Sequence, residues 1–436
     1  MEFLRAVLQI IIGVSTFCLL VMMGYQLIVG LFGFRKKGKD YADHDPASRF
    51  LILVPAHNEE KVIGDIVRNL RELDYPKDLY DYYVIADNCT DGTAEAARAA
   101  GARVIETRKE SPDAPTGKPI ALRKALEALE GYQKRYDLMM VFDADNLMDN
   151  SILREVNSQY LDKGKPDLIQ CYLGVKNKKG TVAWSYYTGY TLTNRFFDLA
   201  KYRLGINCVI GGTGFAISTA YLYQRGGWNS MSLTEDFEIQ VQATMEGRKI
   251  LWNQNARVYD EKPTSLRVSL RQKTRWGQGH WYVALTNTRK LFRLALQGKI
   301  GAGEFISLLT YMYSMSAFLL AAVQIAAQVL LWAVTPGMKL LDPNVAGTVA
   351  GAAIFVYSYL FLFYVADRMD NGIRFSLKTI PVMIGGMLVN TIVGAYSQLV
   401  GLIRYRDQQH WVKTEHAIRA DNQYVEKPQA VKAKAA

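Results

Sequence analysis

The chain has 436 residues, 50% of them apolar, and its 52 basic and 41 acidic side chains give a formal net charge of +11. Its length allows two or three domains, and its apolar residues fall partly in long blocks, which is typical of a membrane protein. Much of the positive charge flanks these blocks or lies in the C-terminal segment, so anionic lipid is the expected partner and nucleic acid is not. The four cysteines have neither disulfide-framework nor zinc spacing, which predicts buried free thiols.

The first apolar block runs from residue 7 to residue 34 without a charge and is long enough to cross a bilayer. A signal peptide would have a shorter apolar region and a small-residue cleavage site, whereas this block continues into the basic run "RKKGKD". Residues 1–40 are therefore predicted to be a retained transmembrane anchor. By the positive-inside rule, the segment that follows lies in the cytoplasm.

Residues 46–280 alternate short apolar runs with helical patterns. The expected strands are residues 50–56, 82–87, 102–107 and 138–145. This alternation predicts an α/β domain with a parallel sheet covered by helices. Ligands of such sheets bind beyond the carboxyl ends of the strands, where this chain carries "PAHNEE", "ADNCTDGT" and "DADN".

The last expected strand ends on two carboxylates, Asp143 and Asp145. Two carboxylates in one cleft repel each other unless a positive group lies beside them, and a divalent cation with oxygen ligands would supply it. The pattern favours Mg²⁺ or Mn²⁺ together with a phosphorylated ligand, because these ions take few protein carboxylates and fill the remaining positions with water and phosphate. A strand-end aspartate also commonly caps a helix, so Asp143 alone is equally consistent with a structural role.

The motifs "VPAHNEE", "DNCTDGT", "GKPIALRKAL", "DAD", "GGTGFAIS", "LTEDFEI" and "QKTRW" follow one another between residues 50 and about 290. In this order the chain resembles membrane-embedded family 2 glycosyltransferases of the cellulose, chitin and hyaluronan synthase type. The resemblance implies an α/β GT-A fold, which is Rossmann-like with a mostly parallel sheet. It also implies a nucleotide-sugar donor, usually linked to UDP, and transfer with inversion at the anomeric carbon.

The same resemblance implies roles for individual residues. Asp87 would meet the uracil, Asp143 would lie near the ribose and diphosphate, and Asp145 would bind the metal. Lys118 would lie beside the diphosphate, a point charge suited to phosphate. The "TED" motif would supply the base that deprotonates the acceptor, with Asp236 as the candidate and Glu235 as the neighbour that competes for the role.

Further substrate contacts are expected from two backbone turns and one helical motif. They are Pro55, Ala56 and Glu59 after the first strand, Gly212 and Thr213 in a tight turn, and Gln272, Arg275 and Trp276 in a Q-x-x-R-W pattern. In the processive synthases that the pattern resembles, the Arg contacts the diphosphate and the Trp packs on the terminal acceptor sugar. Trp276 alone would more often be a packing residue or an interfacial anchor.

The rest of the chain is divided into an interfacial amphipathic helix at 281–300, a transmembrane region at 303–404 and a basic cytosolic tail at 405–436. The transmembrane region has three apolar stretches, at 305–334, 345–365 and 380–403. If all three stretches crossed the membrane, starting from the cytoplasmic domain, the basic tail would lie outside the cell. We therefore expect residues 380–403, interrupted by Pro381 and the pair Gly385 and Gly386, to be re-entrant or parallel to the membrane.

Polar side chains within these stretches have two interpretations. Gln324, Gln328, Asn390 and Gln398 line a path for a growing glycan, or they form hydrogen bonds between helices. Three or four spans are few for a channel in one chain, and a homo-oligomer such as a dimer could complete such a path.

The resemblance implies a metal-dependent, inverting hexosyltransferase, and the apolar and basic patterns predict a plasma-membrane protein with a cytoplasmic catalytic domain. The best guess for the donor is UDP-glucose, used to elongate a polysaccharide processively and to secrete it. The alternative is a non-processive enzyme that adds one or a few sugars to a membrane lipid. The expected partners are the UDP-sugar, Mg²⁺ or Mn²⁺, a glycan or lipid acceptor and membrane lipids, with no nucleic acid. A non-catalytic transporter or scaffold is a third hypothesis, which the complete set of motifs argues against.

Overall fold

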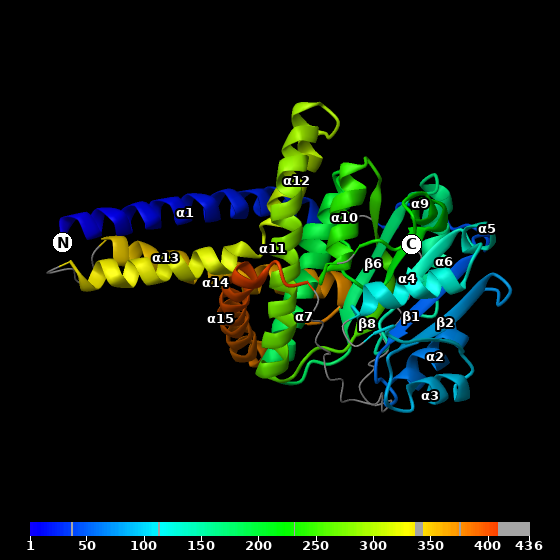
Figure 1. The fold of residues 1–436 in the computed structure, drawn as a ribbon. Helices are drawn as coiled ribbons and strands as arrows, with labels where there is room; N and C mark the ends of the chain where they lie inside the picture. Colours follow the sequence, from blue (N-terminus) through cyan, green and yellow to red (C-terminus); the bar gives the residue numbers. More distant parts are fainter. Residues whose placement is uncertain (36–37, 112–113, 231, 336–342, 375, 409–436) are drawn as a thin grey trace.

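The structure is a computed structural model that describes residues 1–35, 38–111, 114–230, 232–335, 343–374 and 376–408. It has a globular α/β part at one end and an arm of long helices at the other (Figure 1). Most of the predicted tail, 405–436, lies outside the described residues.

One eight-stranded sheet forms the centre of the globular part, with the strand order β3-β2-β1-β4-β7-β6-β8-β5. Its strands are β1 (Phe50–Ala56), β2 (Tyr80–Asp87), β3 (Arg103–Thr107), β4 (Leu138–Val141), β5 (Leu147–Met148), β6 (Leu168–Val175), β7 (Phe215–Ser218) and β8 (Ile250–Asp260). The first four strands are parallel, and β7 enters antiparallel between β4 and β6. The expected mostly parallel sheet is confirmed. One expected strand was too long: β4 ends at Val141, so Asp143 and Asp145 lie in the loop after it.

Helices cover both faces of this sheet, because its central strands are apolar on both sides. Along β1, Phe50, Ile52 and Val54 pack on one face, and Leu51 and Leu53 pack on the other. The first face is covered by α2 (Ile63–Arg71), α3 (Thr93–Ala99) and α6 (Ile152–Asp162). The second is covered by α4 (Lys118–Ala128), α5 (Tyr132–Arg135), α9 (Thr219–Gln224) and α10 (Glu235–Met245).

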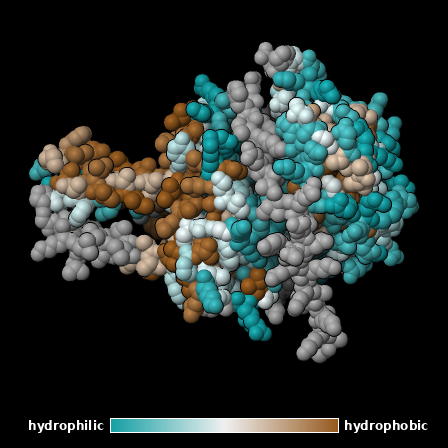
Figure 2. All heavy atoms as spheres, turned by 90° about the horizontal axis from the view of Figure 1, so that it is seen from below, coloured by the Kyte–Doolittle hydropathy of each residue, from teal (hydrophilic) through white to brown (hydrophobic). Residues whose placement is uncertain are grey.

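The helical arm contains apolar helices of membrane-spanning length. Four helices of the described chain meet that criterion by length and composition: α1 (Glu2–Gly30), α13 (Ser316–Ala333), α14 (Pro343–Asn371) and α15 (Ile380–Arg404). Leu8 of α1 packs against Ala327 and Leu331 of α13, and Gln324 donates a hydrogen bond to Thr16 at 2.9 Å. Apolar side chains dominate the visible surface of the arm (Figure 2). Gln324 thus matches the interpretation in which polar residues join neighbouring helices.

The predicted stretch 305–334 is wrong as a single segment. The structure divides it into α12 (Ala302–Met312) and α13, with a turn between them. The hydroxyls of Ser314 and Ser316 donate to the carbonyls of Tyr311 and Tyr313 at 2.8 and 2.6 Å. Such local bonds compete with the helical pattern and favour a break. Only α13 retains the properties of a span.

The predicted interruption of residues 380–403 is also wrong, because α15 is continuous. Pro381 lies in its first turn, where no intrahelical N–H is needed. Its glycines allow close packing instead: Gly386 lies against the backbone of α7 (Gly180–Thr193), and Gly401 lies against Gly277. The helix runs crosswise to α1 and α13 in Figure 1, so its predicted orientation parallel to the membrane does not require a broken backbone.

The predicted interfacial helix is the second half of a longer one. α11 (Leu266–Leu296) is continuous, so the expected boundary at residue 280 falls inside it. α15 packs along this helix: the Lys273 ammonium is hydrogen-bonded to Asn390, and the Trp281 indole donates to the Gln398 carbonyl at 3.1 Å. These contacts connect the membrane-facing helices directly to the Q-x-x-R-W segment.

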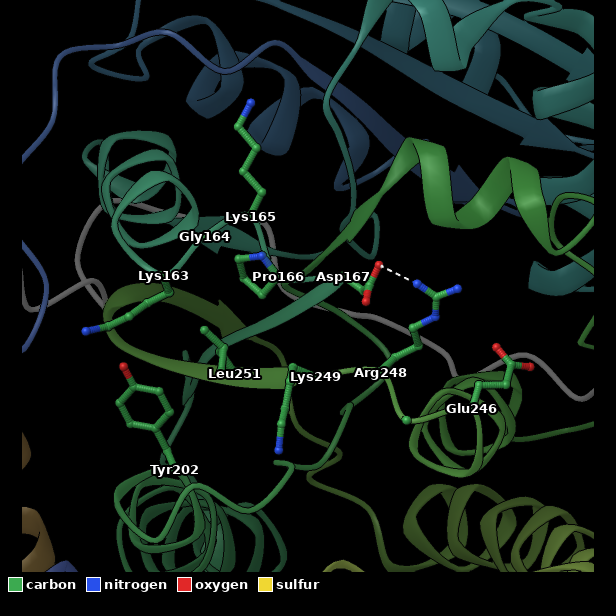
Figure 3. A pocket seen from close by; sticks show the side chains of 11 residues that line it. Lys163, Gly164, Lys165, Pro166, Asp167, Tyr202, Glu246, Arg248, Lys249 and Leu251 are labelled. Atoms are coloured by element: carbon green, nitrogen blue, oxygen red, sulfur yellow. Dashed lines mark ion pairs between the residues drawn. The ribbon is translucent and has the colours of Figure 1, made fainter. Parts of the chain in front are cut away.

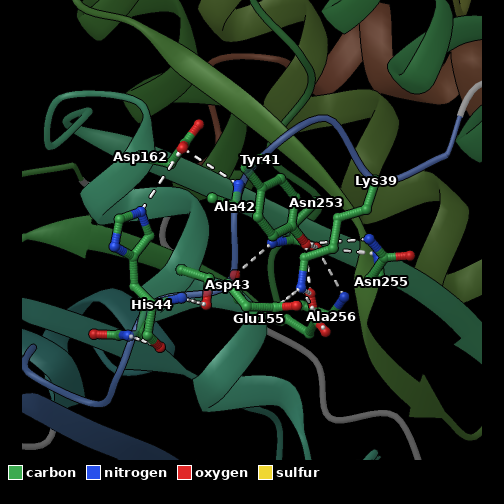
Figure 4. A network of polar contacts seen from close by, with 12 residues as sticks. Lys39, Tyr41, Ala42, Asp43, His44, Glu155, Asp162, Asn253, Asn255 and Ala256 are labelled. Carbon is green, nitrogen blue, oxygen red and sulfur yellow. Dashed lines mark hydrogen bonds and ion pairs between the residues drawn. The ribbon is translucent and has the colours of Figure 1, made fainter.

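The segment after α1 is held on the globular part by a polar network (Figure 4). The Tyr41 hydroxyl donates to Glu155 at 2.6 Å and lies 2.9 Å from an acceptor oxygen of Asn253, while Lys39 forms an ion pair with Glu155 at 2.9 Å. The Ala42 amide also donates to Asp162 at 3.2 Å. This network joins the first apolar helix to α6 and β8.

Candidate active site

A cavity of about 730 Å³ opens beyond the carboxyl ends of β1, β2 and β4, and α10, α11 and α12 close its other side. Every predicted site residue lines it: Pro55, Ala56, Glu59, Asp87, Lys118, Asp143, Asp145, Gly212, Thr213, Glu235, Asp236, Gln272, Arg275 and Trp276. Predicted site residues that are spread over more than two hundred positions of the chain thus lie around one cleft. The individual roles remain predictions.

A second cavity, of about 520 Å³, lies at the amino ends of β6 and β8 (Figure 3). Lys163, Lys165 and Lys249 line it, together with an ion pair of Arg248 and Asp167 at 3.6 Å. None of the predicted site residues lines this cavity.

Asp87 is fixed at the end of β2. Its carboxylate accepts hydrogen bonds from the Thr107 hydroxyl at 2.7 Å and from the Asn88 amide at 2.8 Å. Its backbone carbonyl lies 2.7 Å from a ring nitrogen of His57. With only 5% of its surface exposed, Asp87 is held in one position at the edge of the cavity.

The loop after β4 is organised by hydrogen bonds from three parts of the chain. The Lys118 ammonium donates to Asp143 at 2.5 Å and to the Gly212 carbonyl at 2.6 Å. The Asp145 carboxylate accepts from the Glu261 amide at 2.8 Å and from Asn146 at 3.2 Å. One loop therefore holds a carboxylate paired with a cation beside one bonded to neutral donors.

Asp260, at the end of β8, adds a carboxylate that sequence reasoning missed. Burial raises its pKa to about 6; the Lys262 ammonium opposes this shift, and the charges of Asp145 and Asp143 add to it. One of its oxygens pairs with Lys262 at 2.5 Å, and the other is buried without a hydrogen-bond partner. Its signal in the sequence is limited to the charged run "DEK" at 260–262.

This donor set fits a divalent cation with an incomplete protein shell. Within the described chain, no group of three or more His, Cys, Asp and Glu side chains is arranged to hold a metal ion by itself. Mg²⁺ and Mn²⁺ sites in phosphate-handling proteins commonly use one or two carboxylates and complete the shell with substrate oxygens. The oxygen without a partner on Asp260 and the neighbouring Asp145 match that pattern.

The "TED" motif begins a helix that points its first turn into the cavity. α10 starts at Glu235, and acidic residues there are favoured by the helix dipole. Glu235 is only 6% exposed, whereas Asp236 is more open to the cavity. A carboxylate oxygen of Asp236 lies 2.9 Å from where a Cβ on Gly212 would stand, and Gly212 has a φ of +80°. Both the turn and the approach of Asp236 require glycine at this position.

The two carboxyls share a raised affinity for protons. Burial raises the pKa of Glu235 to about 7, the Asp236 charge adds to the shift, and Lys118 and Arg275 oppose it. Burial also raises the pKa of Asp236, against hydrogen bonding by the Phe237 amide and the charges of Lys118 and Arg275. The pair therefore takes up a proton at a higher pH than an exposed carboxyl would.

This sharing predicts the pH dependence of any reaction that uses the pair as a base. Below its raised pKa the base is protonated, so kcat should fall about tenfold per pH unit on the acid side of that pKa, which lies above the usual range of a carboxyl. Glu235→Gln removes the neighbouring negative charge and should move this limb to lower pH. The pH profiles of both proteins would measure the shift, and identical profiles would contradict the sharing.

The Q-x-x-R-W residues lie on one face of α11, because positions 272, 275, 276 and 280 recur at helical spacing. The Arg275 guanidinium donates to the Leu233 carbonyl at 3.0 Å, just before α10. The Tyr186 hydroxyl donates to Gln272 at 2.9 Å, and its ring meets Trp276 edge-on at 6.2 Å between centroids. Tyr186 of α7 therefore contacts both Gln272 and Trp276, the motif residues on either side of Arg275.

His280 continues the same face, although no metal-ligand spacing in the sequence pointed to a chemical role for it. Its ring stacks on Phe237 with 4.2 Å between centroids, and it lines the cavity. Burial lowers its pKa to about 4, so it is neutral at physiological pH. Lys262 and Tyr190, also missed, lie together with the ammonium 3.7 Å from the ring centre.

A mostly parallel sheet with a cleft of carboxylates, lysines and an arginine beyond its strand ends defines a GT-A domain, the nucleotide-sugar class of α/β folds. Residues 46–279, more than half of the chain, match the family model described as "Glycosyltransferase like family 2". The chain belongs to this family.

Two relatives illustrate its range. The probable glycosyltransferase YdaM of Bacillus subtilis is 27% identical over 247 residues, which are 56% of this chain and 58% of YdaM. The chain thus spans under two thirds of that relative. Beta-monoglucosyldiacylglycerol synthase of Nostoc sp. is 25% identical over 373 residues, which are 84% of this chain and 76% of the relative.

Two further comparisons extend the range. Glucomannan 4-beta-mannosyltransferase 7 of Arabidopsis thaliana is 23% identical over 385 residues, covering 84% of this chain and 64% of the relative. Among solved structures, the mannosyltransferase PcManGT from Pyrobaculum calidifontis, in complex with GDP-Man and Mn²⁺, superposes with a TM-score of 0.59 at 17% identity. The superposition covers 88% of this chain and 99% of PcManGT. At this identity the likeness concerns the fold.

Proposed function

We propose that the protein is an inverting, metal-dependent glycosyltransferase that moves a hexose from a UDP-sugar to a membrane lipid. The observation that carries the proposal is the single cavity in which Asp145, Asp236 and Arg275 meet. It provides an anchor for a metal, a base and a phosphate-binding cation within one cleft. UDP-glucose is the first donor to test.

In the proposed reaction, the acceptor hydroxyl attacks the anomeric carbon as Asp236 takes its proton. The bond from that carbon to the diphosphate oxygen breaks, and its electron pair leaves with the diphosphate. Lys118 and Arg275 bind phosphate oxygens, and Trp276 holds the acceptor in line with the donor carbon. Asp145, with Asp260 beside it, would hold Mg²⁺ or Mn²⁺, which neutralises the charge that develops on the departing diphosphate.

A lipid acceptor is supported by the similarity to a beta-monoglucosyldiacylglycerol synthase. This similarity covers 84% of the chain, and so includes apolar helices as well as the cleft. It also agrees with the small number of apolar helices, since a lipid needs no channel through the chain. Processive synthesis of a polysaccharide remains the second candidate, because the Q-x-x-R-W residues line the cleft and glucomannan mannosyltransferases are also relatives.

Donor and product together test this proposal. Purified protein in lipid vesicles should release UDP from one member of a panel of UDP-sugars, and only with Mg²⁺ or Mn²⁺ present. The product should extract with lipid and carry one or a few sugars. A product that grows into a polymer would favour the second candidate, and no UDP release from any donor would contradict both.

We further propose that the catalytic domain is cytoplasmic, with α1, α13 and α14 crossing the membrane and α15 lying along its inner surface. α15 exposes an apolar stripe, Leu388, Ile392, Tyr396, Leu399 and Ile403, at helical spacing. With three crossings, both the basic run after α1 and the end of α15 fall on the cytoplasmic side, as the positive-inside rule requires.

A pair of single-cysteine variants tests this topology. In a background without native cysteines, Arg406→Cys at the end of α15 should resist a membrane-impermeant thiol reagent in intact cells, whereas Glu2→Cys should react. Permeabilised cells should label both and so control for exposure. Rapid labelling of residue 406 in intact cells would instead make α15 a fourth crossing.

A further inference from the structure

The cavity has two chemically different ends. Charged residues crowd the end beside β1, β2 and β4, where Asp87, Asp143 and Lys118 lie. The other end is lined by aromatic and apolar side chains: Phe237, Trp276, Tyr311 and Met315. Asp236 approaches Gly212, whose carbonyl accepts from Lys118, and the following residue, Phe237, lines the aromatic end, so Asp236 stands where the two ends meet.

The aromatic end consists of rings packed on one another and is uncharged. Phe237 meets Tyr311 edge-on at 5.2 Å between centroids, and His280 stacks on Phe237 while lying 5.9 Å from Tyr311. None of the side chains that line this end carries a charge near neutral pH, because burial keeps His280 neutral and raises the pKa of Tyr311. Such a surface suits apolar groups and offers nothing to hold a phosphate.

This end of the cavity also adjoins the membrane helices. Tyr311 is in the last turn of α12, and Met315 immediately precedes α13. Phe318, in the first turn of α13, packs against Gly394 of α15, so closely that a Cβ at Gly394 would lie 2.7 Å from its ring. The turn between α12 and α13 therefore forms the junction between the cleft and the apolar arm.

We infer that an uncharged lipid with a hydroxyl head group, of the diacylglycerol kind, enters the cleft past Tyr311 and Met315. Its apolar body lies along the turn between α12 and α13, and its hydroxyl reaches Asp236 beside Trp276. The inference rests on the proposed function and adds the passage and the charge class of the acceptor. A phosphorylated lipid would meet no unpaired cation among the described side chains of this wall, because Lys262 is paired with Asp260 at 2.5 Å, and Lys118 and Arg275 face the donor diphosphate.

A photoactivatable diacylglycerol in phosphatidylcholine vesicles with the full-length protein tests the passage. After irradiation, the peptide containing Tyr311 and Met315 should be labelled, and excess unlabelled diacylglycerol should remove most of that label while phosphatidic acid should not. Val329 of α13, 56% exposed on the arm, provides the control for bulk lipid, whose label neither competitor should remove. Label at 311–315 that is absent, or that phosphatidic acid displaces equally, would overturn the inference.

Kinetics provide an independent test. Met315→Glu places a charge in the passage and should raise the KM for diacylglycerol by about tenfold or more, with UDP affinity unchanged. Ile306→Glu is the matched control, since Ile306 is on α12, is 48% exposed and does not line the cavity; its KM should match that of the wild type. Equal KM values for both variants would overturn the passage. Wild-type protein that releases no UDP from any donor would instead refute the proposed function.

Discussion

Replacing Asp236 with Asn should reduce sugar transfer by about 100-fold or more while leaving the affinity for UDP within about twofold of the wild type. A positioned base contributes about 10²- to 10⁴-fold to a proton-transfer step, and an amide cannot accept the proton. Asp236 and Asn have the same shape, so the close approach to Gly212 is preserved. The loss should therefore appear in kcat and not in donor binding.

Glu235→Gln is the matched control, because the two carboxyls are adjacent, burial raises the pKa of both, and Lys118 and Arg275 oppose both shifts. Glu235 is buried, so its amide variant should retain much of the transfer rate at neutral pH and shift only the pH profile. UDP release with a saturating acceptor, and calorimetric UDP binding, would measure both effects. If Glu235→Gln is inactive and Asp236→Asn is active, the base has been assigned to the wrong residue.

Asp145→Asn should abolish the dependence on Mg²⁺ or Mn²⁺ and lower transfer by a similar factor, because the metal loses its charged ligand. The hydrogen bond from the Glu261 amide to this side chain can persist, since an amide oxygen also accepts. The variant should consequently keep its thermal stability. This separates loss of the metal from loss of the fold.

The measurement is UDP affinity with and without Mn²⁺ in wild type and variant. Mn²⁺ should tighten UDP binding to the wild type and have little effect on Asp145→Asn. Removal of metal from the wild type with a chelator should reproduce the behaviour of the variant. Equal metal enhancement in both proteins would show that Asp145 is not a ligand, and Asp260 would become the next residue to substitute.

The sequence allowed the sheet and the cleft to be predicted because both depend on local patterns. Apolar runs predicted the strands, and polar clusters at their ends predicted which residues face a ligand. The rule that parallel strands present their carboxyl ends at one edge then brought Asp87 and Asp143 together. The helical spacing of Gln272, Arg275 and Trp276 similarly placed them on one face.

Asp260 was missed because its position depends on sheet order and not on local pattern. β8 lies between β6 and β5 in the sheet. This order places the Glu261 amide, which directly follows Asp260, 2.8 Å from the Asp145 carboxylate, although more than one hundred residues separate them in the chain. No periodicity in either segment encodes that contact.

The bounds predicted for the membrane segments differ from the observed helices for another reason. Hydropathy reports length and polarity, but helix breaks depend on side-chain bonds such as those of Ser314 and Ser316. Conversely, Gly386 and Gly401 look like breaks in the sequence and serve as packing contacts in α15. A glycine's role is decided by the neighbour against it, which the sequence does not specify.

The central claim is that this cleft transfers one sugar, with inversion, to a lipid, and the covalent product tests it most directly. Purified protein, UDP-glucose, Mn²⁺ and diacylglycerol vesicles should give a lipid that has gained a single hexose by mass spectrometry, in the β configuration by NMR, with one UDP released per sugar. A product of α configuration, or sugar recovered only as a lipid-free polymer, would contradict the account.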